Sequence, residues 1–528
     1  MQLIETGVFK KAEDEKYEAL YKGIPFKLGV SSEHFSTWLF SSLEKRKIDE
    51  IAREISGVYF ICVRDKRKNE IYILIDNASL FKVYYGNNFF SDSILQIAKQ
   101  EGLTSANVNR EKILEYIRFG GFFPPDTLFD NIKQLSGDEI LFVNREKEFK
   151  ILKKEESVSC IEFEDFFDEL EISLNNSKIS CDLTGGMDSR LLAVALNFHK
   201  MDLSLFTASS QIKKESSIAK KISDILGIEH LEIENTLSDP DFELKSSDIL
   251  SEGLVNTINM HRNIQVADFR KRHGFNLIFN GNGGALYKEI YMMHEFPFYT
   301  IGKLDAARTY RMRIEPVKFQ FDILEKNMSA LKDEVDESVI SKIKSVLLSK
   351  KSDSLMNIWY KLELPAVTGA LSSTITNNYY DVYSPFLEYS LFLYSIRQNV
   401  SEKVFDMWHR KLITKYNRRV ARLSTTNDVT SSSEYRYMAK DEFITIYNRG
   451  YRLLRKISQK TLRKTLFLGN SLSDSYYSNV RNSKYVRENL QLLVDIGILK
   501  KNIDINYISN NTLGNLVSIS YFLQEIDK

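Results

Sequence analysis

The chain is poor in cysteine and proline, and it has no long apolar run. Its 528 residues include three cysteines, Cys62, Cys160 and Cys181, and eight prolines. Because the cysteines form an odd, scattered set inside apolar segments, we expect reduced core residues rather than disulfides or a metal site. No segment approaches the roughly 20 apolar residues of a membrane span, and residues 1–11 lack the basic and apolar regions of a signal peptide. The sequence therefore predicts a cytoplasmic protein that does not span a membrane.

Neither sign of charge is in excess. Lysine and arginine total 72, aspartate and glutamate total 71, and the formal net charge is +1. This balance argues against bulk electrostatic attraction to nucleic acid or to an anionic membrane, and we expect neither as a partner. The length predicts a large globular enzyme with about two or three domains. A homodimer is compatible with the sequence.

The most informative segment is the decapeptide C-D-L-T-G-G-M-D-S-R at residues 181–190. A strand-like run at 179–183 leads into the turn Gly185-Gly186, and an apolar stretch of helical character follows at 191–196. In this geometry the unpaired amides of the helix N-terminus and the positive end of its dipole converge on one point. The two glycines let the backbone approach a phosphate with no Cβ in the way.

The polar side chains of this segment suit the same ligand. Thr184 and Ser189 offer hydroxyl donors, and Asp188 can hold a divalent cation that a polyphosphate would bring. The pattern is neither the P-loop nor the dinucleotide fingerprint. A Gly-Gly turn can also be simply the shortest link between a strand and a packed helix. We favour a nucleotide or pyrophosphate site because the acid, the hydroxyls and the glycines are together at the carboxyl end of a strand.

Residues 184–189, T-G-G-M-D-S, resemble the S-G-G-x-D-S pyrophosphate loop of ATP pyrophosphatases, with Thr184 in place of the first serine. The arrangement is similar to that of asparagine-synthetase-like proteins, which include β-lactam synthetases and lasso-peptide cyclases. The resemblance implies an α/β fold with a parallel-sheet synthetase domain of the adenine-nucleotide α-hydrolase type. It also implies that ATP and Mg²⁺ are used to adenylate a carboxylate, after which ammonia or an amine displaces AMP.

The chain after this loop continues the pattern. A second strand is expected at 203–207, a helix at 215–226 and a third strand at 230–233, which together form a β-α-β-α-β run. In the family, the end of the second strand lies near the adenine. The resemblance therefore places Phe206 in the nucleotide site.

A second glycine-rich turn follows an apolar strand at 276–279. The segment 280–285, N-G-N-G-G-A, resembles the S-G-E-G-x-D segment of asparagine synthetases, so Gly281, Asn282 and Gly283 are implied to contact the nucleotide. Asn282 and Ala285 replace the two acids that serve metal and ATP in the family. Asp188 would then hold Mg²⁺ with phosphate oxygens, and Glu289 could reach back as a second ligand if its segment is helical.

Two segments of the C-terminal half extend the resemblance. Residues 383–389 are similar to the family's R-x-P-F-L-D segment, and residues 405–415 to its K-x-x-L-R segment, whose lysine approaches the phosphates. A cation is needed there because negative charge grows on the α-phosphate. One register puts Arg410 at the lysine position, with Lys411 as the near alternative, and these are our candidate catalytic residues. The other register puts His409 there.

The N-terminal third has a different residue pattern, with short apolar segments separated by polar turns. Short apolar strands at 57–63 and 70–76 flank a charged turn and predict a hairpin, and a further strand is expected at 139–144. Over roughly residues 50–150 the order is similar to the glutaminase domain of asparagine synthetases, which implies an Ntn-hydrolase-like α+β sandwich. Such glutaminases need an N-terminal cysteine, whereas this sequence starts M-Q-L and its first cysteine, Cys62, is expected in mid-strand.

These observations predict three domains: a degenerate glutaminase-like domain at 1–155, an ATP-pyrophosphatase synthetase domain at 156–440 and a helical extension at 441–528, with a basic amphipathic helix at 447–464. We expect an AMP-forming carbon–nitrogen ligase without its own glutaminase activity. Its acceptor would be a small-molecule or peptide carboxylate. Nitrogen would come from ammonia, from an amine on the acceptor or from a separate donor protein. The alternative is a non-catalytic nucleotide-binding sensor or scaffold.

Overall fold

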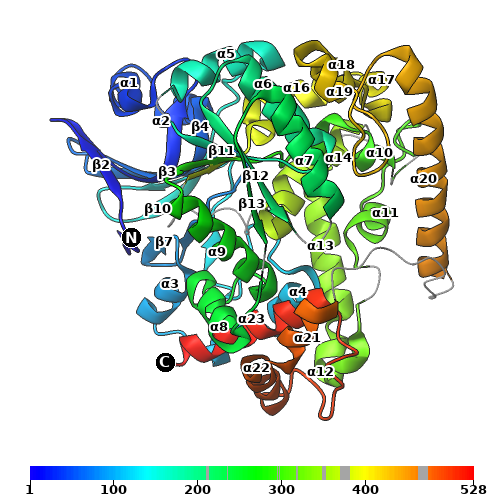
Figure 1. The fold of residues 1–528 in the computed structure, drawn as a ribbon. Coiled ribbons are helices and arrows are strands. Elements are labelled where there is room, and N and C mark those ends of the chain that lie inside the picture. The colour runs from blue at the N-terminus through cyan, green and yellow to red at the C-terminus, as the bar shows by residue number, and fades with distance from the viewer. Residues whose placement is uncertain are drawn as a thin grey trace.

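The computed structural model describes residues 1–175, 177–209, 213–234, 236–293, 295, 298–316, 319–347, 352–368, 381–461 and 474–528. These residues form three sheets surrounded by helices, and one of the three is wholly parallel (Figure 1). The expected mixed α/β class is therefore confirmed. Among the described residues, no helix combines the length and the apolar character needed to cross a membrane.

The N-terminal third contains two sheets. The larger is antiparallel, in the order β10 (Phe149–Lys153), β9 (Glu139–Val143), β5 (Glu70–Ile75), β4 (Ile55–Asp65), β3 (Tyr17–Lys27) and β2 (Lys10–Glu13). The smaller is mixed, in the order β1 (Gln2–Leu3), β7 (Phe89–Ser91), β6 (Tyr84–Tyr85) and β8 (Lys133–Gln134). The predicted hairpin is confirmed, because β4 and β5 pair in antiparallel register from Phe60 and Ile75 to Asp65 and Glu70.

Strand β4 is apolar on both faces because both faces are covered. Tyr59, Ile61 and Val63 pack in a cluster with helix α1 (Phe35–Leu43), whereas Phe60 and Cys62 belong to the main core. Alternate residues of a strand point to opposite sides, so each set meets its own layer. Cys62 is thus a buried mid-strand residue, as expected, and burial raises the pKa of its thiol to about 12.

The parallel sheet carries the predicted phosphate loop. Its order is β13 (His230–Glu234), β12 (Leu203–Ser209), β11 (Ile179–Asp182), β14 (Leu277–Phe279) and β15 (Asp381–Tyr383). The strands predicted at 179–183, 203–207, 230–233 and 276–279 are confirmed, and β15 was not predicted. Since all five strands are parallel, their carboxyl ends meet at one edge of the sheet, where α/β proteins bind ligands.

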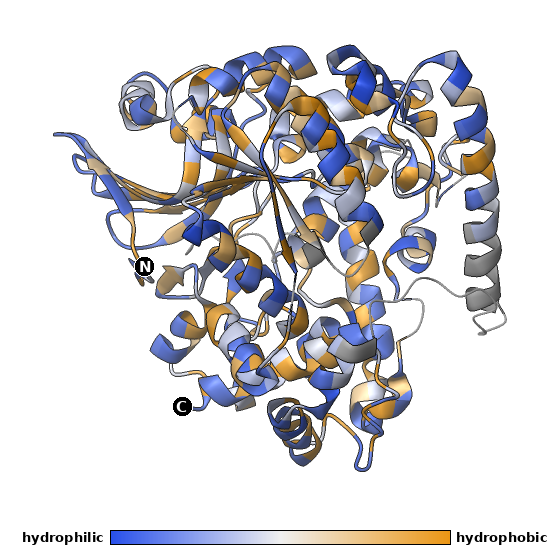
Figure 2. Ribbon diagram, viewed as in Figure 1, coloured by the Kyte–Doolittle hydropathy of each residue, from blue (hydrophilic) through white to orange (hydrophobic). Residues whose placement is uncertain are grey.

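Helices cover both faces of this sheet. Phe279 shares a hydrophobic cluster with Leu191 and Leu192 of α6 (Met187–Phe198), whereas its neighbour Ile278 packs with Ala267 of α9 (Thr257–Arg272). Because α6 is enclosed, its residues 189–196 are all buried, which explains the unbroken apolar run there. Figure 2 shows the same pattern, with hydrophobic colour concentrated on the strands and on the inward sides of the helices.

Strand β15 joins the N-terminal sheets to the parallel sheet. The rings of Phe26 on β3 and Tyr383 on β15 are 5.4 Å apart, and the Gly57 amide donates to Glu388 Oε2 at 3.3 Å. One hydrophobic cluster consequently includes Phe60 of β4 and Leu191 of α6. The boundary predicted near residue 155 therefore crosses a continuous core, and the three-domain division stays a prediction.

The C-terminal helices return to the N-terminal third. Helix α23 (Asn510–Ile526) packs against α4 (Arg110–Phe119), and the Asn515 side-chain amide donates to Ile117 O at 3.1 Å (Figure 1). The region expected as an extension is helical where it is described, and its last helix is part of the second large core. The predicted basic helix overlaps α20 (Tyr435–Thr461), but the side chains of 449 and 452–461 and residues 462–464 lie outside the described residues.

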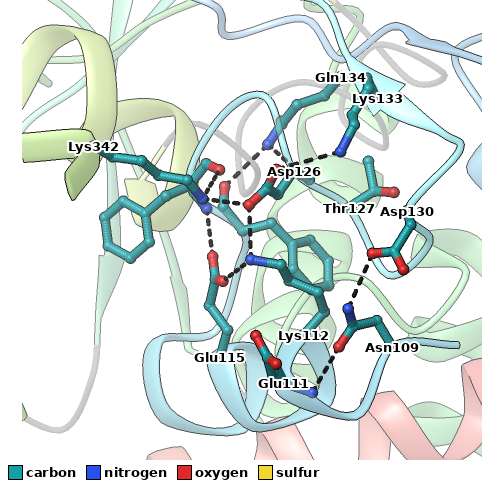
Figure 3. A network of polar contacts seen from close by, with 12 residues as sticks. Asn109, Glu111, Lys112, Glu115, Asp126, Thr127, Asp130, Lys133, Gln134 and Lys342 are labelled. Carbon is teal, nitrogen blue, oxygen red and sulfur yellow. Dashed lines mark hydrogen bonds and ion pairs between the residues drawn. The ribbon is translucent and has the colours of Figure 1, made fainter. Parts of the chain in front are cut away.

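A polar cluster around Asp126 ties α4 to α13 (Lys332–Val346), as Figure 3 shows. Asp126 Oδ2 lies 2.7 Å from Lys112 Nζ and 2.6 Å from Lys342 Nζ, and Oδ1 lies 3.5 Å from Lys133 Nζ. Burial would raise the pKa of Asp126, but Lys342 and Lys112 outweigh burial and hold that pKa well below its usual range. The Gln134 side-chain amide donates to Asp126 O at 2.9 Å. Both the carboxylate and the carbonyl of Asp126 therefore have partners inside the fold.

Candidate nucleotide-binding site

The predicted phosphate loop lies between β11 and α6 at the carboxyl edge of the parallel sheet. Its shape is fixed by two hydroxyls. The Thr184 amide donates to Ser189 Oγ at 3.0 Å, the Thr184 and Ser189 hydroxyls lie 2.9 Å apart, and the Gly186 amide donates to Thr184 Oγ1 at 3.2 Å. Thr184 and Ser189 therefore hold the turn closed in the absence of any ligand contact.

The loop leaves backbone donors without partners. The amides of Gly185 and Met187 form no hydrogen bond to any described residue, and no side chain caps the N-terminus of α6 at Gly186. Thr184 is exposed and Gly186 is half-exposed, so solvent or a ligand can reach this point. Free amides at a helix N-terminus attract anions, both by hydrogen bonding and through the helix dipole.

The second glycine turn packs directly against the first. A Cβ on Gly281 would lie 2.8 Å from the Ser189 amide nitrogen, and a Cβ on Gly284 would lie 2.5 Å from the Asp188 Cγ. Only glycine allows this approach, so both positions are explained by contact between the two turns. The structure thus brings residues 184–189 together with residues 281–284.

Asn280 links this turn to β15. Its Oδ1 accepts hydrogen bonds from the Asn282 amide at 3.0 Å and from Ser384 Oγ at 2.6 Å. Asn282 Oδ1 in turn accepts from the Gly283 amide at 3.1 Å. The side chains of Asn280 and Asn282 therefore serve to shape the turn.

Two basic side chains of the protein meet the Asp188 carboxylate. Lys288 Nζ lies 2.6 Å from Asp188 Oδ1, and His409 Nε2 lies 2.8 Å from the same oxygen. Lys288 directly follows the short helix η4 (Gly284–Tyr287), and His409 is on α18 (Met407–Tyr416). His409 is fully buried, and neither of its ring nitrogens has an aligned hydrogen bond to a described residue, although Nε2 is within ion-pair distance.

The charges of these three groups follow from their surroundings. Burial would raise the pKa of Asp188, but Lys288 and His409 hold it well below its usual range. Burial would lower the pKa of Lys288, and the Asp188 carboxylate outweighs this and raises it. Burial lowers the pKa of His409. Near neutral pH the site therefore contains a carboxylate, an ammonium and a neutral imidazole.

Sequence reasoning missed Lys288 and gave His409 only as the second register. The signal for His409 was its place in the K-x-x-L-R-like segment, counted from Leu412. Lys288 carried no motif signal; the only hint was a cation shortly after a glycine turn that contains no acidic residue. Both residues reach Asp188 only through tertiary packing, since Lys288 is 100 residues and His409 221 residues further along the chain.

The two predicted catalytic cations contact other parts of the molecule. Arg410 is buried and donates from one guanidinium nitrogen to Asp441 Oδ2 at 2.9 Å and to Ser432 O at 3.0 Å. The Lys411 side chain is 58% exposed, and its Nζ lies 3.9 Å from Glu402. Successive residues of a helix point about 100° apart, so His409, Arg410 and Lys411 cannot all face the loop. The structure puts His409 there, in the second register.

Phe206 lies one strand away from the loop, and its ring is covered. The Arg270 guanidinium carbon is 3.9 Å from the ring centroid, and Arg270 is also paired with Asp182 at the end of β11. The Phe206 side chain is 1% exposed. Adenine stacking on this ring, as expected from the resemblance, would require Arg270 to move.

The residues at Asp188 do not fit a magnesium site. Asp188 already meets Lys288 and His409, and Glu289, the second expected ligand, accepts a hydrogen bond from the Phe405 amide at 3.4 Å. Among the described residues, no group of three or more His, Cys, Asp and Glu side chains is arranged to hold a metal ion. Mg²⁺ prefers several oxygen ligands in octahedral geometry, and a lysine ammonium beside the one available carboxylate opposes it.

A cavity of about 610 Å³ lies elsewhere, between the N-terminal sheets and helix α8 (Pro240–Ser251). Its walls include Lys22, Lys82, Asp92 and Glu252, and no residue of the two glycine turns. The candidate site at α6 is therefore defined by its free amides and close-packed turns rather than by this cavity.

Comparison of the chain with protein families and with curated proteins found no matching family model and no matching protein. The chemistry of the site must consequently be argued from its own residues.

Proposed function

We propose that the chain is an ATP-dependent synthetase that activates a carboxylate with release of pyrophosphate and transfers the acyl group to ammonia or an amine. One observation carries the proposal: two glycine turns, at the carboxyl ends of the neighbouring parallel strands β11 and β14, meet at the uncapped first turn of α6. The resemblance to asparagine-synthetase-like enzymes supports the same reading. Under it, the N-terminal sheets are an Ntn-hydrolase-like sandwich that does not hydrolyse glutamine.

The residues present suit the phosphate side of this chemistry. The amides of Gly185 and Met187 and the hydroxyl of Thr184 would hold phosphate oxygens of ATP, and Lys288 would offset their charge. In the first step a carboxylate oxygen bonds to the α-phosphorus while the bond to the bridging oxygen breaks and pyrophosphate leaves. Developing charge is stabilised by donors that are already in place, which is the largest contribution in many enzymes.

His409 suits the second step. When nitrogen attacks the activated acyl group, AMP leaves and the nitrogen loses a proton. A neutral imidazole without an aligned hydrogen bond can accept that proton, whereas Arg410 cannot because its guanidinium stays protonated. His409 is therefore the general base of this proposal. The nitrogen donor is ammonia, an amine of the acceptor or a separate protein, and the acceptor is a small-molecule or peptide carboxylate.

A second candidate function is a nucleotide-binding sensor or scaffold without catalysis. It is favoured by the position of Arg410, which is held in a buried pair with Asp441, and by the exposure of Lys411 away from the loop. Under this reading the glycine turns keep their affinity for phosphates, while neither Arg410 nor Lys411 supplies a cation to the reacting centre.

The decisive experiment combines ATP binding with ATP–pyrophosphate exchange over a panel of carboxylates. Gly186→Asp is the test variant, because its φ of −81° suits any residue and a Cβ would meet only Thr184 Oγ1, at 3.3 Å. Aspartate at this N-cap position would hold its own carboxylate over the free amides and exclude an anion without unfolding the helix. Gly186→Ala is the matched control.

We expect the wild type to bind ATP and to catalyse exchange. Gly186→Ala, which adds a Cβ without a charge, should bind ATP more weakly than the wild type, and Gly186→Asp should lose both binding and exchange while its melting temperature is maintained. ATP binding without exchange on any carboxylate would reject the synthetase and support the sensor. No ATP binding by the wild type would reject both candidate functions.

A further inference from the structure

Asp188 is the residue at which the resemblance and the structure diverge most. The resemblance implies a carboxylate that carries Mg²⁺ to the triphosphate. In the structure the same carboxylate carries two protein groups, with Lys288 Nζ at 2.6 Å and His409 Nε2 at 2.8 Å from one oxygen. The positive charge that the family obtains from metal is thus already present as a side chain.

The fold holds this lysine in place. Gly284 presses against Asp188 so closely that a Cβ would lie 2.7 Å from the Asp188 Cβ and Oδ1. Lys288 follows Gly284 after the single turn of η4, and its amide donates to Ala285 O at 3.2 Å. The side chains of Lys288 and Asp188 are 18% and 29% exposed, so the pair is largely shielded from solvent.

The side chains that might bind a metal at this position are otherwise engaged or absent. Ala285 has no ligand atom, Asn282 Oδ1 accepts from the Gly283 amide, and Glu289 accepts from the Phe405 amide. A divalent ion would therefore find a single carboxylate with an ammonium already beside it. This is an unfavourable site for Mg²⁺, which needs oxygen ligands and is repelled by a nearby cation.

A lysine can do part of what the metal does. Its ammonium is a compact charge with three hydrogen-bond donors, and one pairing with Asp188 leaves others for phosphate oxygens. Asp188 anchors the lysine at the first turn of α6, the same turn whose N-terminus has the free amides of Gly185 and Met187. An arriving phosphate would then meet donors that are already in place.

We propose that Lys288 is a built-in cation that takes the place of a divalent metal ion, so that this site binds nucleotide without Mg²⁺. The inference rests on the proposed function only in requiring that nucleotide binds at the loop. It adds that the negative charge of the triphosphate is offset by the chain itself and that the loss of acids at 282 and 285 is matched by the gain of a lysine at 288.

The test is titration of ATP into the full chain by calorimetry, once with millimolar MgCl₂ and once with EDTA. We expect the two dissociation constants of the wild type to agree within about threefold. The test variant is Lys288→Met, which keeps the apolar stem and removes the charge. It should bind at least about tenfold more weakly in EDTA. MgCl₂ should restore part of this loss, because Asp188 is then free to take the metal.

Two controls accompany the variant. Lys484→Met removes a lysine whose side chain is 78% exposed on α22 (Lys484–Asp495) and should behave as the wild type in both buffers. Lys288→Arg keeps the charge and should keep metal-independent binding, with thermal melting reporting that each variant is folded.

The outcomes separate the two claims. Wild-type binding that is lost in EDTA would overturn the metal-free site and leave the proposed function standing. Absence of ATP binding in either buffer would end the proposed function and this inference together. Equal binding by the wild type in both buffers, converted to metal dependence by Lys288→Met, would support both claims.

Discussion

Asp126 and Asp188 are two carboxylates with similar partners and different surroundings. Each is held by lysine, and in each the neighbouring cations keep the pKa of the carboxyl well below its usual range. Around Asp126 the neighbouring hydrogen-bond donors also have other acceptors within the protein. Lys342 donates to Phe123 O, and the Gln134 side-chain amide donates to Phe122 O. Around Asp188 two backbone amides have no partner among the described residues, and both ring nitrogens of His409 lack an aligned hydrogen bond.

The difference teaches which signal identifies a site. A strongly lowered carboxyl pKa occurs at both positions, so it does not separate a structural cluster from a functional one. Buried polar groups without partners are rare in folded proteins and need a separate explanation. At Asp188 we propose a ligand as that explanation, whereas at Asp126 the fold itself satisfies the groups. The predictions below test this distinction, from the largest expected effect to the smallest.

The largest effect is expected at the pair of Arg410 and Asp441. As at Asp126, the charged groups of this pair have their partners inside the protein. Arg410→Met should lower the free energy of unfolding by about 4 kcal/mol, because it leaves a buried carboxylate without its cation. Urea denaturation measures this. Arg422→Met, which breaks an exposed pair with Glu434, should cost far less because solvent screens both charges. If Arg410→Met keeps its stability but loses ATP binding, Arg410 contacts the nucleotide and the structural role is wrong.

Asp126→Asn should be the next most severe change. Three lysines lose their shared carboxylate, although Lys112 keeps Glu115 at 2.8 Å, and we expect a loss of about 3 kcal/mol in the free energy of unfolding. ATP affinity measured on the folded protein should not change. Asp333→Asn, at a side chain that is 88% exposed, is the control. A change in ATP affinity with little loss of stability would contradict the division between the two clusters.

Lys403, which contacts the segment after the second glycine turn, should make the free energy of unfolding depend on pH. Its buried ammonium donates to Leu286 O at 2.9 Å, and burial lowers its pKa to about 7. Between pH 7 and its ordinary value of 10.5 the unfolded chain binds the extra proton, so stability rises with pH in this window. From pH 7 to 9 the wild type should gain about 2 kcal/mol relative to Lys403→Met. If the free energies of unfolding of the two proteins change with pH in the same way, the lowered pKa of Lys403 is wrong.

The smallest effect is expected at Thr184. Thr184→Val removes the hydroxyl that contacts Ser189 Oγ and accepts from the Gly186 amide, so the loop loses two of the contacts that fix its shape. ATP should bind about tenfold more weakly, while the free energy of unfolding changes by less than about 1 kcal/mol. Thr184→Ser, which keeps the hydroxyl, should restore binding. A large loss of stability would mean that the hydroxyl of Thr184, like the Asp126 cluster, mainly stabilises the folded protein.

Much of the fold could be predicted from local patterns. The strand at 179–182, the glycine turn and helix α6 follow from an apolar strand pattern, two glycines and an apolar run within twenty residues. The hairpin of β4 and β5 was found in the same way. Strand β15 was missed because its three residues are too few to show an alternating pattern. Its place beside β14, and its contacts with β3, depend on pairing between distant segments.

The candidate site also has a part that local sequence predicts and a part that depends on contacts between distant segments. The sequence by itself determined a helix N-terminus with free amides and the glycines that expose it, because these are properties of about ten consecutive residues. Only the tertiary structure decided that Lys288 and His409, rather than Arg410 or a metal ligand, meet Asp188. The physical reason is that a helix turns about 100° per residue, so packing of α18 selects which side chain faces the loop.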